Sequence, residues 1–371
     1  MPHPKSTVIR QFIIDQVEEH PADVSRLTAE HFGITRQAVR RHLTSLIEDG
    51  MLTAEGETRS RRYALVVAKH DWVLNLAEHR DEDKIWRELI EPLTWDLPQN
   101  IQHICYYGFT EMFNNCIDHS CGTVTLVRAM ISPKKMSLHI LDDGVGIFEK
   151  IRTAFHLNDH REAILELSKG KLTTDPGRHS GQGIFFTSRA FDEFALASNH
   201  LVFVHRSGMA EHSSDGEGWL VEKALDNNSG TFISMEVSLS SDRILREVFD
   251  RYTDLEDGDY PFSKTHVPLS LARYGNEQLV SRSQAKRVLA RFDRFEEVML
   301  DFSGIEDIGQ AFADEIFRVF RRGNPGIKLQ HIHANDRVTQ MIRRAESTPI
   351  ETPGAGDGHP PGPGETGPGG G

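Results

Sequence analysis

Apolar residues recur at helical spacing in the first part of the chain. Val8, Phe12 and Val17 share one face of a helix predicted over residues 6–22, and a second short helix begins at Ser25. Gly33 ends that second helix, and the pattern then starts again. The chain therefore opens with a group of short amphipathic helices.

A third helix is predicted over residues 36–48, with Thr35 as its N-cap. Apolar residues occupy one face, and the polar positions near its start hold Arg36, Gln37, Arg40 and Arg41. After Gly50, the alternating segments 51–53 and 61–65 flank a polar turn and predict a β-hairpin.

Three helices followed by such a hairpin resemble a winged helix-turn-helix domain, here over residues 1–69. In that fold the third helix enters the major groove of double-stranded DNA, and cations of the wing contact phosphates. The DNA-binding candidates are Arg36, Gln37, Arg40, Arg41, Arg59, Arg61 and Arg62. A solvated helix face and a winged helix used for protein contacts are the alternatives. With ten Lys and Arg against nine Asp and Glu, the segment is nearly neutral, so a homodimer is the expected DNA-binding form.

The middle of the chain carries polar motifs on predicted helices and strands. A helix over residues 108–120 places Glu111, Asn115 and either Asp118 or His119 on one face. The strands 123–131 and 136–141 follow, and the second one leads into Asp142. Three further glycine motifs come next, containing Gly144 and Gly146, then Gly181 and Gly183, then the glycine before Thr231, which opens a strand over 232–237.

This order of motifs resembles the ATP-binding fold shared by gyrase, histidine kinases and MutL, the GHKL superfamily. The resemblance implies an α/β sandwich over residues 70–240, with helices on one face of a mostly antiparallel sheet and a mobile lid. Asn115 then matches the magnesium ligand. Asp142 matches the aspartate that accepts from the adenine amine, with Thr231 nearby through water. The matching glycines are Gly144 and Gly146 beside that aspartate, and Gly181 and Gly183 in the lid.

Glu111 matches the position that polarises the attacking water or hydroxyl in the hydrolysing and serine-kinase branches of the superfamily. The cations of the lid region could screen phosphate charge or lie in solvent; they are Lys169, Lys171, Arg178 and His179. Residues 70–239 hold fifteen Lys and Arg against twenty-five Asp and Glu. A nucleotide would be repelled at long range, so dependence on Mg²⁺ is expected.

The phospho-acceptor pattern of histidine kinases is missing from the segment, so a two-component sensor is not expected. Cys116, His119 and Cys121 lie close together in sequence without an evident fourth metal ligand, so structural thiols are expected.

Residues 262–345 alternate between predicted helices and strands, which is typical of a small α/β domain. The helices are expected over 281–292 and 308–321, and the strands over 297–302 and 328–332. The run VMLDFSGIEDIGQAFADEIFRVF resembles the STAS-like domain related to anti-sigma factor antagonists. Phosphorylatable antagonists carry a serine after the junction aspartate. Here Ile308 follows Asp307, and Ser303 lies four residues earlier, so phosphorylation at that site is not expected.

Composition sets the remaining limits. The 371 residues carry a formal charge of −13, which argues against binding of nucleic acid through the overall field and confines it to local patches. Three cysteines fit a reducing compartment, and no apolar run is long enough to span a bilayer, so a cytoplasmic protein is expected. Residues 346–371 are dominated by Pro and Gly and are expected to be disordered.

The combination suggests an ATP-binding transcription regulator, in which ATP and Mg²⁺ control binding to DNA or to a regulatory protein partner, with slow hydrolysis. The first alternative is an anti-sigma-type protein-serine kinase that acts on a separate partner. The second is a nucleotide-dependent binding module without chemistry.

Overall fold

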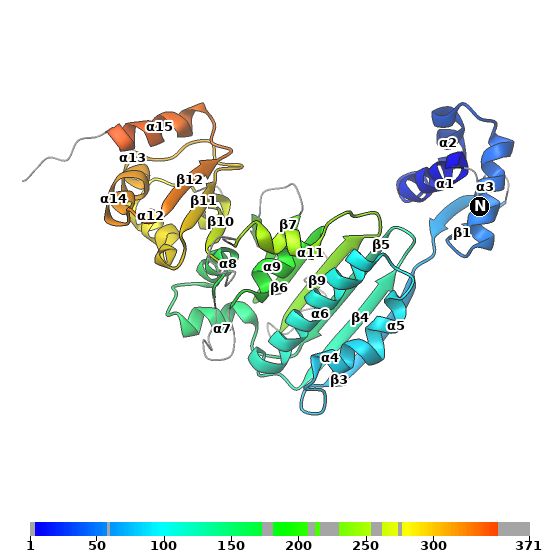
Figure 1. The fold of residues 1–371 in the computed structure, drawn as a ribbon, viewed down its shortest axis with the longest axis horizontal. Coiled ribbons are helices and arrows are strands. Elements are labelled where there is room, and N and C mark those ends of the chain that lie inside the picture. Colours follow the sequence, from blue (N-terminus) through cyan, green and yellow to red (C-terminus); the bar gives the residue numbers. More distant parts are fainter. Residues whose placement is uncertain are drawn as a thin grey trace, which may run out of the picture.

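The computed structural model describes residues 4–57, 60–172, 181–206, 212–215, 230–253, 262–273 and 277–347. Its strands form a two-stranded, a seven-stranded and a three-stranded sheet, in that order along the chain (Figure 1). The expected mixed α/β multidomain organisation is therefore confirmed. The tail expected to be disordered lies, from residue 348 on, outside the described residues.

The N-terminal part contains three helices and a hairpin: α1 (Pro4–Gln16), α2 (Val24–Phe32), α3 (Arg36–Glu48), β1 (Leu52–Glu55) and β2 (Arg62–Leu65). The prediction for α3 is confirmed, and Thr35 caps it by accepting from the backbone N–H of Ala38 at 3.2 Å. The first helix ends at Gln16, earlier than expected. A separate core centred on Ile13, Val17 and Val39 holds this part together.

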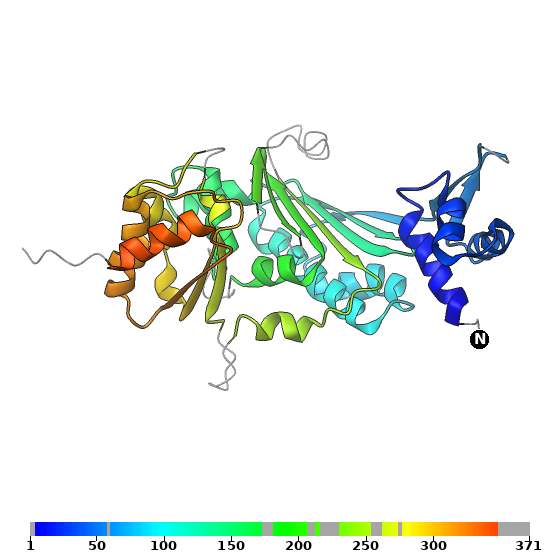
Figure 2. The same ribbon diagram turned by 90° about the horizontal axis from the view of Figure 1, so that it is seen from above.

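The central sheet has the order β3-β4-β5-β9-β6-β7-β8, and every neighbouring pair is antiparallel. Its strands are β3 (Ala68–Asn75), β4 (Val124–Ile131), β5 (Lys135–Asp142), β6 (Glu193–Ser198), β7 (Leu201–Arg206), β8 (His212–Asp215) and β9 (Thr231–Ser238). Alternate residues of β5, such as Leu138 and Ile140, are fully buried. Figure 2 shows helices gathered against one face of this sheet.

The helices of the central part are α4 (Glu82–Ile85), the π-helical η2 (Trp86–Ile90), α5 (Glu91–Thr94), α6 (Gln99–His119), α7 (Ile147–Ala154), α8 (His160–Lys169), α9 (Gly183–Ala190) and α11 (Leu245–Asp250). Helix α6 begins at Gln99 rather than at residue 108, because Ile101, Ile104 and Cys105 extend its buried face. It continues through Gly108, where a side chain would collide with the ring of Phe191.

The C-terminal sheet is parallel, with the order β10-β11-β12, and its strands are β10 (Lys264–Pro268), β11 (Glu297–Asp301) and β12 (Lys328–Ile332). The helical segments around it are η3 (Leu269–Ala272), α12 (Arg282–Leu289), η4 (Phe292–Arg294), α13 (Gln310–Ala313), η5 (Asp314–Phe320), α14 (Arg321–Gly323) and α15 (Asp336–Ser347). The predicted alternation of helix and strand is confirmed, but β10 and α15 were not predicted.

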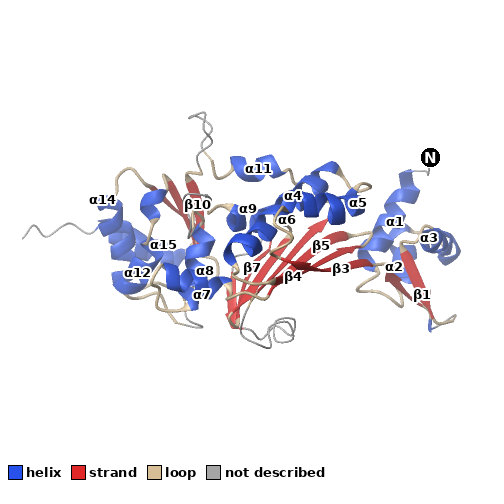
Figure 3. Ribbon diagram, turned by 90° about the horizontal axis from the view of Figure 1, so that it is seen from below, coloured by secondary structure: helices blue, strands red, loops and turns tan. Residues whose placement is uncertain are grey.

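The buried residues of the central and C-terminal parts form one continuous core. Helices α7 and α8 lie between the seven-stranded and the three-stranded sheet (Figure 3). Helix α8 contacts both β10 and η3. The two parts therefore pack as neighbours that share a hydrophobic interface.

Candidate functional site

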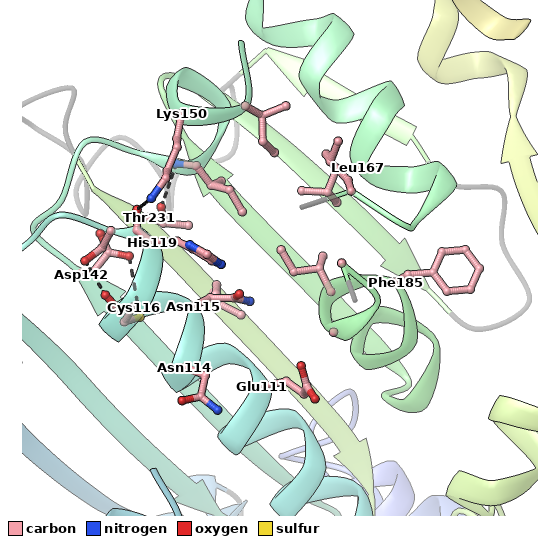
Figure 4. Close-up of a pocket in the computed structure, with 18 of the residues that line it drawn as sticks. Glu111, Asn114, Asn115, Cys116, His119, Asp142, Lys150, Leu167, Phe185 and Thr231 are labelled. Carbon is pink, nitrogen blue, oxygen red and sulfur yellow. Dashed lines mark hydrogen bonds between the residues drawn. The ribbon is translucent and has the colours of Figure 1, made fainter. Parts of the chain in front are cut away.

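Helix α6 turns one side into the core and directs polar residues into a cleft. Its fully buried residues include Phe109, Met112 and Phe113. Glu111, Asn115 and His119 line the cleft at successive helical turns (Figure 4). The expectation that these three share a face is confirmed, whereas Asp118 is exposed and does not line the cleft.

The cleft is a cavity of about 280 Å³ bordered by α6, the end of β5, α7 and the start of α9. Six of the residues predicted from the sequence to contact a nucleotide line it: Glu111, Asn115, Asp142, Gly181, Gly183 and Thr231. Apolar side chains complete the wall, among them Ile147, Ile151, Leu167, Leu172 and Phe185. An apolar wall with a few converging polar groups is typical of a small-molecule site.

Asp142 is the buried carboxylate of this cleft, with 5% of the residue exposed. The backbone N–H of Gly144 donates to its Oδ1 at 2.9 Å, and the Cys116 thiol lies 3.8 Å from its Oδ2. Burial raises the pKa of Asp142 to about 6, against the lowering effect of the Gly144 N–H. Such a carboxylate would gain from a ligand that donates a hydrogen bond to it.

Cys116 is buried, as its apolar position predicts, and it also borders the cleft. Burial, followed by the nearby carboxylate of Asp142, raises the pKa of this thiol well above its usual range. The thiol therefore stays protonated and acts as a weak donor to Asp142.

Gly144 and Gly146, predicted as nucleotide contacts, do not line the cleft. A side chain on Gly144 would collide with the carbonyl oxygen of Ser120, and Gly146 has a φ of +85°. Both glycines shape the tight turn from β5 into α7. Thr231 supports the same turn, because its hydroxyl oxygen accepts from the backbone N–H of Ile147 at 3.1 Å.

The carboxylate of Glu111 faces the first residue of α9. A Cβ on Gly183 would overlap Glu111 Oε2, so a side chain there would displace this carboxylate. Gly181, with a φ of +69°, precedes α9 and packs against the backbone of Leu172. The start of α9, where the first N–H groups have no partner within the helix, thus lies beside the one carboxylate of α6 that lines the cleft.

Two of the predicted cations of the lid region, Lys169 and Lys171, do not line the cleft. Lys169 is fully buried, and its ammonium donates to Glu166 and to backbone carbonyls of the C-terminal part. The ammonium of Lys171 donates to the carbonyl of Arg294 at 2.6 Å. Both expected roles, phosphate screening and simple solvation, are therefore wrong for these two lysines. Arg178 and His179 lie outside the described residues.

Among the described residues, the cleft is lined by a single Lys or Arg side chain, that of Lys150 on α7. Its ammonium donates to the carbonyl of His119, at the end of α6, at 2.6 Å (Figure 4). The place of Lys150 at the cleft could not be predicted from the sequence, because a single lysine in an amphipathic helix usually faces solvent.

The donors present fit a magnesium ion that arrives with phosphate oxygens. The Asn115 amide lies at the cleft with its Nδ2 4.0 Å from Met112 Sδ, and the Glu111 carboxylate lies one turn away. Mg²⁺ prefers oxygen ligands and takes several from water or phosphate. Among the described residues no cluster of three His, Cys, Asp or Glu could hold a metal alone.

The DNA-binding candidates on α3, namely Arg36, Gln37, Arg40 and Arg41, are exposed and make no ion pair with other described residues. Arg62 is exposed as well. Arg61 is half-buried, with its guanidinium 5.6 Å from the centre of the Tyr63 ring. Arg59 lies outside the described residues.

A family model described as a STAS-like domain of unknown function (DUF4325) matches residues 284–339. The STAS-like resemblance of the C-terminal part is therefore supported. No curated protein matches the chain. None of the helices in the described ranges is long and apolar enough to cross a membrane.

Two positions bear on phosphorylation of this STAS-like part. Asp307 accepts through Oδ1 from the backbone N–H of Ile308 at 2.8 Å, and no hydroxyl follows it. The Ser303 hydroxyl donates to Asp301 Oδ1 at 2.7 Å, and His333 Nδ1 lies 2.9 Å from the same oxygen. Ser303 thus belongs to a hydrogen-bonded cluster at the end of β11.

Proposed function

We propose that residues 70–240 form a GHKL-type ATP-binding domain in an ATP-dependent transcription switch. One observation carries this proposal. The buried carboxylate of Asp142, the Glu111–Asn115 pair of α6 and the glycines before α9 come from distant parts of the sequence, yet all border one cleft.

In this proposal the adenine amine donates a hydrogen bond to Asp142. Because Asp142 is buried, a ligand that offers no hydrogen-bond donor would bind less well. The phosphates lie towards Asn115, Lys150 and the N-terminus of α9, where backbone N–H groups and the helix dipole favour anions. Asn115 would hold Mg²⁺ together with phosphate oxygens, and the ion would neutralise charge on the phosphoryl group. Glu111 orients water for in-line attack and accepts its proton.

The two flanking domains are proposed to bind the macromolecules that the nucleotide site controls. The N-terminal part, with exposed Arg40 and Arg41 at the start of α3, is proposed to be a winged helix-turn-helix domain that binds double-stranded DNA as a homodimer. The STAS-like part is proposed to bind a regulatory protein partner. Occupancy of the cleft by ATP then controls how these two domains are presented.

The fate of γ-labelled ATP separates the proposal from a kinase. Slow release of labelled phosphate, lost in Glu111→Gln, is the expected result. Label retained on added or endogenous protein would instead establish the serine-kinase alternative. Absence of ATP binding by the full chain would refute the nucleotide proposal as a whole.

The DNA proposal has its own test. Combined Arg40→Ala and Arg41→Ala should weaken DNA binding and lower the slope of log affinity against log salt by about 2, one for each lost phosphate contact. Arg26→Ala is the matched control, because Arg26 is an exposed arginine on α2 already paired with Asp23 and Glu30. Equal DNA affinity in the double variant and the control would favour a protein-contact role.

A further inference from the structure

Helix α8 separates the nucleotide cleft from the C-terminal domain and contacts both. Leu167 lines the cleft. Glu162 and Glu166, on neighbouring turns, form ion pairs with Arg287 and Arg291 of the C-terminal domain, at 3.4 and 2.9 Å. All residues from Glu162 to Lys169 are buried. The helix is therefore fixed between two functional regions.

Lys169, at the end of α8, ties this helix to the C-terminal domain. Its ammonium donates to Glu166 Oε1 at 2.6 Å and to the carbonyls of Arg287 and Ala290 at 3.1 and 3.0 Å. The Thr265 hydroxyl of β10 donates to the Lys169 carbonyl at 2.7 Å. Burying a charged lysine without exposed surface destabilises the fold unless its N–H groups are hydrogen-bonded. The ammonium of Lys169 has three such partners.

Two residues later, the chain is held again by arginines of the C-terminal domain. The carbonyl of Lys171 accepts from Arg291 Nη2 at 3.2 Å and from Arg294 Nη1 at 3.1 Å. In return, the Lys171 ammonium donates to the Arg294 carbonyl and lies 4.8 Å from the centre of the Phe295 ring. The backbone of Lys171 is thus fixed from two sides.

The next residue belongs to the cleft itself. Leu172 lines the cavity, and its backbone N–H donates to the carbonyl of Gly181 at 3.2 Å. Gly181 also lines the cavity and adjoins the start of α9. Only Lys171 and Leu172 separate the two arginines from the glycine that is proposed to meet the phosphates.

We propose that Arg291 and Arg294 are positioning residues for the ATP site, so that docking of the STAS-like domain sets nucleotide affinity. This inference rests on the proposed ATP-binding function. By linkage, ATP must then stabilise the same docked arrangement. A partner that displaces the C-terminal domain from α8 would lower ATP affinity, and ATP would oppose that partner.

The geometry of Arg291 sharpens the prediction. Its Nη1 lies 2.9 Å from Glu166 Oε2 while its Nη2 donates to the Lys171 carbonyl. A lysine keeps the charge but has a single nitrogen, so it cannot serve both positions as the planar guanidinium does. Arg291→Lys therefore tests geometry rather than charge.

The test compares ATP·Mg²⁺ affinity in full-length variants by calorimetric titration. Arg291→Lys combined with Arg294→Ala should weaken ATP binding about 5- to 20-fold. The matched control is Arg321→Ala, which removes an ion pair to Glu346 within the same domain and does not touch α8. The control should bind ATP within about twofold of the unaltered chain.

A second measurement on the unaltered chain covers the case in which the double variant fails to fold. ATP·Mg²⁺ should slow amide hydrogen exchange in residues 282–294. Unchanged exchange there despite measurable ATP binding, or unchanged ATP affinity in a folded double variant, would overturn the inference. Failure of the unaltered chain to bind ATP would instead overturn the proposed function, and the inference with it.

Discussion

The two domains that flank the central cleft are attached to the seven-stranded sheet in different ways. The C-terminal domain shares one buried core with it and encloses the ammonium of Lys169, which has no exposed surface. The N-terminal domain has its own core. Its described ion pair to the central sheet, Glu18 to Lys134 at 3.0 Å, joins side chains that are 49% and 38% exposed.

This difference indicates which flanking domain is joined to the cleft through fixed contacts. Exposed ion pairs contribute about 0–1 kcal/mol, whereas breaking a buried, satisfied charge is strongly unfavourable. A change at the cleft therefore has a rigid route to the STAS-like domain. The N-terminal domain leads directly into β3. It is expected to respond to a change at the cleft by a change in its orientation.

The largest expected effect concerns the chemistry of the cleft. Glu111→Gln should lower ATP turnover about 10²- to 10³-fold, because the carboxylate that orients and deprotonates water is lost. ATP affinity should stay within a few-fold, since the amide keeps the size of the side chain beside Gly183. Phosphate release and equilibrium binding measure the two quantities, and normal turnover would remove Glu111 from its role.

Asp142→Ala should weaken ATP binding about 10- to 100-fold, because it removes the buried carboxylate that is proposed to accept from the adenine amine. The same variant should lose its preference for ATP over GTP. Asp143→Ala is the neighbouring control; its carboxylate faces the backbone of Thr123 and Val124 instead of the cleft. Unchanged discrimination in Asp142→Ala would exclude this residue from the site.

Asp142 also predicts a pH dependence of stability in the absence of nucleotide. The pKa of Asp142 is about 6 in the folded chain and near 3.8 in the unfolded chain. The contribution of this carboxyl group to the stability of the fold is therefore complete at low pH and is lost as the pH rises through 6. Asp142→Asn should therefore stabilise the chain by roughly 1–3 kcal/mol at pH 8, with little gain near pH 4. Thermal unfolding at several pH values measures this gain, and a gain independent of pH would contradict it.

Lys150→Ala should weaken ATP binding about 3- to 10-fold by removing a cation from the phosphate end of the cleft, with a smaller effect on adenosine. Arg152→Ala on the same helix is the control, because Arg152 pairs with Glu149 and does not line the cleft. An equal loss of affinity for ATP and adenosine would show that Lys150 acts on the shape of the cleft rather than on phosphate.

The smallest expected effect concerns the N-terminal attachment. Lys134→Ala should leave ATP affinity within about twofold and stability within about 0.5 kcal/mol, because the pair to Glu18 is exposed. A loss of ATP affinity comparable to that of the Arg291 and Arg294 variant would contradict the claim that the N-terminal domain is coupled to the cleft more weakly than the C-terminal domain.

The features that the sequence predicted well depend on local chemistry. Thr35 and the periodicity of α3 define that helix without help from the rest of the chain, and the spacing of Glu111 and Asn115 alone places both on one face. Strand β3 escaped prediction because Lys69, His70 and Asp71 form a polar run in its first half, and apolar Val73 lies on its exposed face.

The roles of the lysines could not be predicted, because they depend on distant segments. Lys169 and Lys171 lie beside the glycine-rich motif in sequence, yet their ammonium groups bind carbonyls more than a hundred positions away. Lys150 lines the cleft with its ammonium bonded to the carbonyl of His119, 31 positions earlier at the end of α6. Sequence motifs predicted six residues that line the cleft, and tertiary packing decided which cations border it.

Amide hydrogen exchange of the full chain, with and without ATP·Mg²⁺, tests whether the cleft binds the nucleotide and transmits its binding to the C-terminal domain. Slower exchange is expected in the turn after Asp142, in residues 183–190 of α9 and in residues 282–294, with no change in the core helices of the N-terminal domain. Unchanged exchange around Asp142 at saturating ATP·Mg²⁺ would contradict the claim that this cleft binds the nucleotide.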